Sequence, residues 1–164
     1  MDRERLCNDI LNTGVMAALI GGFALSSLQT EYNMNEGLDV AIYVTAFVGV
    51  HACTCSSVTS ALLYRYANAL RDEDAPSWAA SHSFLLSLPM AKFGIGCVSY
   101  LLSVVLLSFR DLDTVPFWQK AALLIGLMSM SMTLAIGTWL LTLNSGQTPI
   151  ADIAMTNPAR KSSD

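Results

Sequence analysis

Oxygen-bearing side chains gather where the first apolar stretch of the chain ends. The run "ALSSLQTE" places Gln29, Thr30 and Glu31 after a series of glycines, alanines and leucines, and Glu36 and Asp39 follow before the next apolar stretch. Calcium takes about 6–8 oxygen ligands, so one helix cannot supply them, but a ring of subunits could. Rings of acidic side chains act as filters in cation channels.

We therefore expect an ion-binding filter at Gln29, Thr30 and Glu31, in which Glu31 holds Ca²⁺ transiently as it passes. Glu36 and Asp39 would form an outer acidic mouth that attracts cations. The alternative interpretation is that Glu31 is a solvated side chain at the lipid boundary.

Softer ligands occur in two other stretches. "VHACTCSS" puts His51 and Cys55 on one face of a helix, and "MSMSM" places Met128 and Met132 one turn apart. Imidazole, thiol and thioether groups together suit Cu(I), but buried thiols and methionines also serve as packing. His51 is an ionisable side chain within an apolar stretch, which suggests a role in gating or in packing.

Motifs of enzymes and of nucleic-acid binding are missing from the sequence. It contains no G-x-S-x-G, no H-E-x-x-H and no glycine-rich loop before a lysine, and the net charge is −4. We expect no catalysis, no resident cofactor and no binding of nucleic acid.

Four apolar stretches must position these side chains. Hydrophobic residues make up 53% of the 164 residues and charged ones 13%, and a helix needs about 20 apolar residues to cross a bilayer. The sequence predicts an all-α integral membrane protein with a transmembrane domain at 10–143 and spans at about 10–29, 40–64, 93–109 and 121–143. Residues 1–9 would be a cytosolic N-terminus and 144–164 a flexible cytosolic tail.

The breaks between spans carry further expectations. The second helix should project beyond the membrane, because "YRYANAL" continues it without glycine or proline. A bend is expected near Pro89, before the third span.

The distribution of lysine and arginine predicts the orientation. Seven of these residues lie in the N-terminus, the second loop and the tail, whereas the third loop holds Arg110 and Lys120 and the first loop none. Since cytoplasmic loops carry the excess, both termini should be cytosolic. We expect a multi-pass protein of the plasma membrane.

Small residues recur along the first span. Gly14, Ala18, Gly22 and Ser26 are spaced by four and predict a stripe on one side of the helix. Such stripes let helices approach closely in lipid. The stripe could pack within one subunit, or copies of the helix could crowd around a common axis.

Three stretches resemble the Orai family, the calcium-release-activated calcium channels. "ALIGGFALSSLQ" is similar to the pore helix of that family, Ala46–Phe47 falls where its second span has the same pair, and "IGCVSYLLSVVLLSF" is similar to its third span. The likeness covers roughly residues 15–109.

The resemblance implies a homo-oligomer, hexameric by analogy, whose first helices surround a pore. It implies that the pore is lined by Leu19, Gly22, Phe23, Ser26 and Thr30.

Several positions depart from the family's pattern. The selectivity glutamate of the family falls on Thr30, one residue before Glu31, and its third-span glutamate falls on Ser103, which we expect to have a gating or packing role. The basic residues of its inner pore are absent. The fourth span lacks the family's proline bend, and the tail lacks a helix suited to its coiled-coil activator, so the sequence does not support binding of that partner.

Three functional hypotheses follow. The first is an oligomeric cation channel, permeable to calcium, with its filter at Thr30 and Glu31. The second is a non-conducting four-span scaffold or accessory subunit, whose stripe binds the helices of a partner. The third is a soft-metal transporter for copper.

Overall fold

The protein is described by a computed structural model in which residues 2–145 are placed, so most of the predicted tail, 146–164, lies outside the described residues. The described elements are all helices: α1 (Arg3–Ser27), α2 (Gly37–Ala69), α3 (Ala75–Ser81), α4 (Ser83–Asp111) and α5 (Pro116–Ser145). All except α3 are long and apolar enough to cross a membrane. The prediction of four helices able to span a membrane is therefore confirmed, and α3 is an additional short helix.

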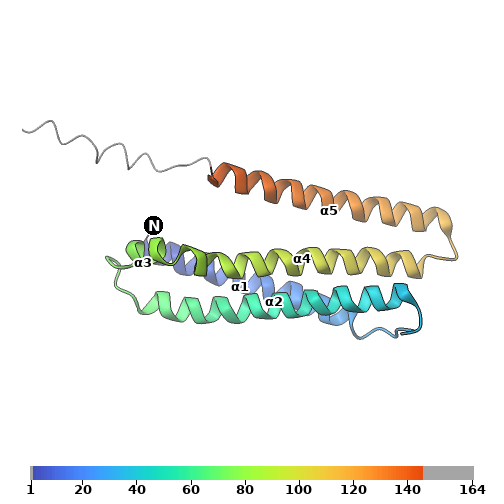
Figure 1. Ribbon diagram of the computed structural model, residues 1–164, viewed down its shortest axis with the longest axis horizontal. Helices are drawn as coiled ribbons and strands as arrows, with labels where there is room; N and C mark the ends of the chain where they lie inside the picture. Colours follow the sequence, from blue (N-terminus) through green and yellow to red (C-terminus); the bar gives the residue numbers. More distant parts are fainter. Residues whose placement is uncertain (1, 146–164) are drawn as a thin grey trace, which may run out of the picture. The chain divides into compact units, whose positions relative to one another are not determined.

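The chain divides into two compact units, residues 1–127 and 128–164, with the boundary inside α5. In the first unit α1, α2 and α4 lie side by side (Figure 1), and each contacts the other two. The described part of the second unit, residues 128–145, is the C-terminal part of α5, in which Met128 and Met132 are exposed.

Small side chains line the contacts inside the first unit. The buried face of α2 carries alanine, glycine, cysteine and serine at spacings of three and four: Ala46, Gly49, Cys53, Ser56 and Ser60. Large apolar side chains such as Leu62, Phe84 and Ile95 point outward instead. This arrangement is typical of helices that approach closely in lipid, where outward apolar surface carries no penalty.

The packing stripe of α1 differs from the predicted one. Gly14 is buried as expected, but Ala18, Gly22 and Ser26 are exposed, and the buried positions after Gly14 are Ala17, Gly21 and Ala24. The reason is geometric. Four residues advance about 400° around a helix, so a spacing of four drifts off any face, whereas alternation of three and four stays on it.

The ends of α1 lie earlier in the sequence than the predicted span of 10–29. Asp2 caps the start, where its side chain accepts a hydrogen bond from the backbone nitrogen of Arg5 at 2.8 Å. The helix ends at Ser27 with Leu28 as its C-cap. Thr30 and Glu31 therefore lie in the loop that follows the helix.

A cluster of apolar side chains joins the start of α1 to the end of α2. It comprises Leu6, Cys7, Ile10, Leu63 and Ala67, and Trp78 of α3 packs against it. Arg3 adds an ion pair of 2.8 Å to Asp72 and a hydrogen bond of 3.3 Å to the carbonyl oxygen of Leu70. These contacts hold the start of α1 against the end of α2 and against α3.

The helix α4 begins at Ser83, well before the predicted span at 93. The break in the chain lies at His82, and Pro89 is an interior, buried residue of α4. The Oγ of Ser56 donates a hydrogen bond of 2.6 Å to the carbonyl oxygen of Pro89. This bond ties α2 to α4 beside the proline.

Candidate functional site

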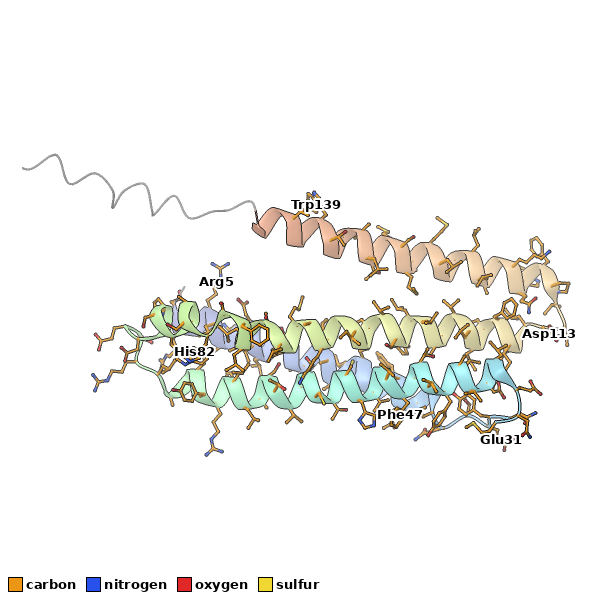
Figure 2. All side chains as sticks on the ribbon, in the orientation of Figure 1. Arg5, Glu31, Phe47, His82, Asp113 and Trp139 are labelled. Atoms are coloured by element: carbon orange, nitrogen blue, oxygen red, sulfur yellow. The ribbon has the colours of Figure 1, made fainter. Side chains whose placement is uncertain are left out.

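The predicted filter and mouth residues lie at the end of the first unit formed by residues 28–39 and 110–115, which we call the hairpin end. Figure 2 shows Glu31 and Asp113 at this end, opposite Arg5 and His82. The hairpin end contains five carboxylates, those of Glu31, Glu36, Asp39, Asp111 and Asp113, and one guanidinium, that of Arg110. The hairpin end therefore carries an excess of negative charge.

Arg110 at the end of α4 connects three segments. Its Nη1 lies 3.1 Å from Oδ1 of Asp39 at the start of α2 and donates a hydrogen bond of 3.3 Å to the carbonyl oxygen of Glu31 in the α1–α2 loop. Its Nε donates a bond of 2.9 Å to Asp111. Asp39 is thus a buried, ion-paired side chain, and its charge is compensated locally.

The α1–α2 loop is folded onto the same pair. The other carboxylate oxygen of Asp39 accepts a hydrogen bond of 2.6 Å from the backbone nitrogen of Asn33. The guanidinium carbon of Arg110 lies 5.6 Å from the ring centroid of Tyr32, within the range of a cation–π interaction. The Tyr32 hydroxyl donates to the carbonyl oxygen of Ser27, which fastens the loop to the last turn of α1.

The predicted filter residues are exposed at this loop. The Thr30 hydroxyl donates a bond of 3.0 Å to the carbonyl oxygen of Ser27, and Gln29 and Glu31 are exposed. Within residues 2–145, no ion pair or hydrogen bond engages the Glu31 carboxylate. The Glu36 carboxylate accepts a bond of 2.8 Å from the Asn33 side chain. Glu31 therefore presents a free carboxylate, whereas Glu36 and Asp39 are engaged.

The predicted pore-lining side chains share one open face of α1. Leu19 and Phe23 are 52% and 56% exposed, and Gly22 and Ser26 are also exposed. Leu19 and Ser26 each lie two residues, about 200° of rotation, from a buried residue that packs in the bundle. Leu19 and Ser26 thus point away from the buried side of α1, whereas Gly22 borders a groove that Val50 and Thr54 of α2 also line. Phe23 is covered in part, because its ring stacks on Tyr100 of α4 with centroids 6.4 Å apart.

A row of aromatic rings leads from the hairpin end along α2. Tyr32 meets Tyr43 edge-on at 5.7 Å, Tyr43 stacks on Phe47 at 6.3 Å, and Phe47 lies 4.2 Å from the ring of His51. His51 is exposed at the end of this row. The spacing of four between Tyr43, Phe47 and His51 indicates from the sequence that these three rings lie on one face of the helix. The contact of Tyr32 with this row depends on how the α1–α2 loop folds.

The remaining candidates do not converge on a metal site. Ser103 is buried, and its hydroxyl donates a bond of 2.7 Å to the carbonyl oxygen of Tyr100 within α4. Cys55 is exposed on α2. In the described part of the chain, no three His, Cys, Asp or Glu side chains group closely enough to hold a metal ion.

Comparisons with known proteins add no relative: no protein-family model, no curated protein and no solved structure matches the chain.

Proposed function

We propose that this chain is the subunit of an oligomeric cation channel, permeable to calcium, in which copies of α1 surround the pore. The observation that carries the proposal is the open face of α1, on which Leu19, Gly22, Phe23 and Ser26 are exposed. A helix that packs in the bundle and also lines a pore needs one buried face and one exposed face, and α1 has both.

The hairpin end supports a role in attracting and selecting cations. Its excess of carboxylates over guanidinium groups favours accumulation of cations near the mouth. Glu31 has a free carboxylate close to the end of α1, and a ring of such groups would provide oxygen ligands for a partly dehydrated ion. Thr30 and Glu31 lie in the loop after α1. The rotation of about 100° between neighbouring residues of a helix therefore does not apply to them, and both side chains could face the axis.

The experiment is a measurement of current through the purified protein in planar bilayers. Glu31→Gln is expected to lower the permeability of calcium relative to sodium, because it removes a charge from every subunit, and Thr30→Ala tests the neighbouring hydroxyl. Glu73→Gln, in the exposed segment between α2 and α3, is the matched control. Unchanged permeability ratios in both Thr30→Ala and Glu31→Gln would rule out the filter.

The arrangement of copies has its own test. Phe23→Cys, in a chain with Cys55 replaced by serine, is expected to crosslink identical subunits under mild oxidation, because a pore brings equivalent residues to one axis. Val48→Cys, an exposed position on α2, is the control. If Phe23→Cys gives no more homodimer than Val48→Cys, the first helices do not meet at an axis.

One observation favours the scaffold hypothesis as a second candidate. The stacking of Phe23 on Tyr100 shows that part of the open face already packs against another helix, as expected of a surface that binds transmembrane helices. A scaffold predicts no current and a mixed adduct between Phe23→Cys and another protein.

A further inference from the structure

A pocket lies at the end of the first unit opposite the hairpin end, among α2, α3 and the start of α4. Its volume is about 350 Å³, within the range of sites for small molecules. The lining is mainly apolar and aromatic, and its side chains include Leu62, Leu63, Tyr66, Trp78, His82 and Leu85. The filter and the pore face of α1 contribute nothing to it.

Flat aromatic surfaces form part of the pocket wall. The rings of Tyr66 and Trp78 lie 5.3 Å apart with an interplanar angle of 34°, and the His82 ring stacks on Trp78 at 5.1 Å. Trp78 also packs against the apolar cluster of α1 and α2, which fixes its position. Such a wall suits a rigid, flat, apolar ligand, since its rings already contact one another and Trp78 packs on the cluster.

The polar groups of the pocket are few and specific. The Thr59 hydroxyl donates to the carbonyl oxygen of Cys55 at 2.6 Å within α2. Nδ1 of His82 lies 3.0 Å from the carbonyl oxygen of Trp78. Because a carbonyl oxygen only accepts, this contact favours the tautomer with its proton on Nδ1, which leaves Nε2 as an acceptor. No described residue donates to Nε2, so it can accept a hydrogen bond from a ligand hydroxyl.

The position of the pocket along the chain agrees with a ligand from the bilayer. It lies where α2 passes from apolar residues to Arg65 and Arg71, and tyrosine and tryptophan concentrate at such membrane interfaces. The spacing of Leu62, Tyr66 and Arg71 also fits the leucine–tyrosine–arginine pattern associated with sterol contact, which by itself has little specificity.

We propose that this pocket binds a sterol, with the ring system against Tyr66 and Trp78 and the hydroxyl donating to Nε2 of His82. A sterol combines a flat apolar body with a single hydroxyl, which normally lies at the level of the membrane interface. The proposal is independent of whether the protein conducts ions.

The test is photo-crosslinking of the protein in phosphatidylcholine vesicles that contain a diazirine sterol. Mass spectrometry of the wild type is expected to find the adduct on peptides of residues 59–66 and 78–85. Adducts confined to other helices would overturn the proposal, and this result requires no variant to fold.

Variants test the hydrogen bond to His82 and the contact with the Trp78 ring separately. His82→Phe keeps a ring but removes the acceptor, and it is expected to lower sterol labelling about fivefold, the equivalent of one hydrogen bond. Its matched control is His51→Phe, which changes the other histidine of the chain beside Phe47. Trp78→Leu should lower labelling by a similar factor or more, compared with Trp118→Leu, at an exposed tryptophan of α5.

Competition with unlabelled compounds tests whether the ligand's hydroxyl is recognised. Excess sterol should compete with the probe, whereas its 3-methyl ether, which cannot donate to Nε2, should compete about fivefold less well in the wild type and equally well in His82→Phe. Equal competition by both compounds in the wild type, or better competition by a phospholipid than by the sterol, would overturn the assignment.

Discussion

A Cβ atom on Gly14 would lie 2.8 Å from the Cβ of Ser60. The helices α1 and α2 therefore touch at this level with no room for a methyl group. Because backbone carries both Cβ atoms, rotation of a side chain cannot relieve the contact. The exact fit of glycine against serine makes this position a sensitive probe of the bundle.

Gly14→Ala is expected to lower the free energy of unfolding by about 1–3 kcal/mol, as overpacked cores do. Gly22→Ala is the matched control in the same helix, because nothing lies within 4 Å of a Cβ placed there. Thermal unfolding in detergent measures both variants. Equal stability of the two variants would contradict the packing of α1 on α2.

Two buried serines of α2 should respond in opposite ways. Ser56→Ala removes the hydrogen bond to the carbonyl oxygen of Pro89 and should cost about 1 kcal/mol. The Ser60 hydroxyl is buried without a partner in the described structure, so Ser60→Ala should be neutral or stabilising. Chemical unfolding of the two variants gives the comparison, and a larger loss in Ser60→Ala would argue against the assigned hydrogen bonds.

The ion pair at the hairpin end can be tested by a double-mutant cycle. Arg110→Gln should lower the midpoint of thermal unfolding because it leaves the buried Asp39 carboxylate without its guanidinium. Asp39→Asn should lower the midpoint less, because Arg110 keeps its bond to Asp111. The double variant should be no less stable than the worse single variant, since no unpaired charge remains. Asp113→Asn, an exposed change at the same end, should have little effect. Additive losses in the double variant would show that the pair does not form.

A disulfide can test the register of α1 against α2. The Cβ of Gly21→Cys would lie 3.1 Å from that of Cys53, close to the usual range of about 3.5–4.5 Å. With Cys55 replaced by serine, copper phenanthroline should join Gly21→Cys to Cys53 within one chain, seen as a loss of two hydrogens by mass spectrometry.

The neighbouring position provides the control for that disulfide. Gly22→Cys has nothing within 4 Å and should not bond to Cys53. Under the channel proposal it should instead join two copies of the chain. Formation of the same intramolecular bond by both variants would contradict the described register.

The four spans could be predicted from the sequence because length and apolar composition suffice for a helix that crosses a bilayer. Their exact ends could not. The residues "APSWAAS" form α3, whose proline lies in the first turn, where a proline is tolerated. Pro89 lies inside α4 against local propensity, beside the hydrogen bond from Ser56.

The chemistry of the candidate site could be predicted in part. The acidic residues of the hairpin end can be read directly from the sequence, and their role as filter and mouth stays a prediction. The pairing of Asp39 with Arg110 joins residues 71 positions apart, and no local pattern reveals such a contact. The same holds for the pocket beside Trp78, which depends on how α3 folds back onto α2.

Arg110 binds the main chain of Glu31 and leaves its carboxylate free. The last turn of α4 is therefore mechanically linked to the backbone of the proposed filter. A rotation or shift of α4 at this level would reposition the Glu31 carbonyl without passing through α1. Under the channel proposal, a stimulus that acts on α4 would reach the main chain of the filter through Arg110.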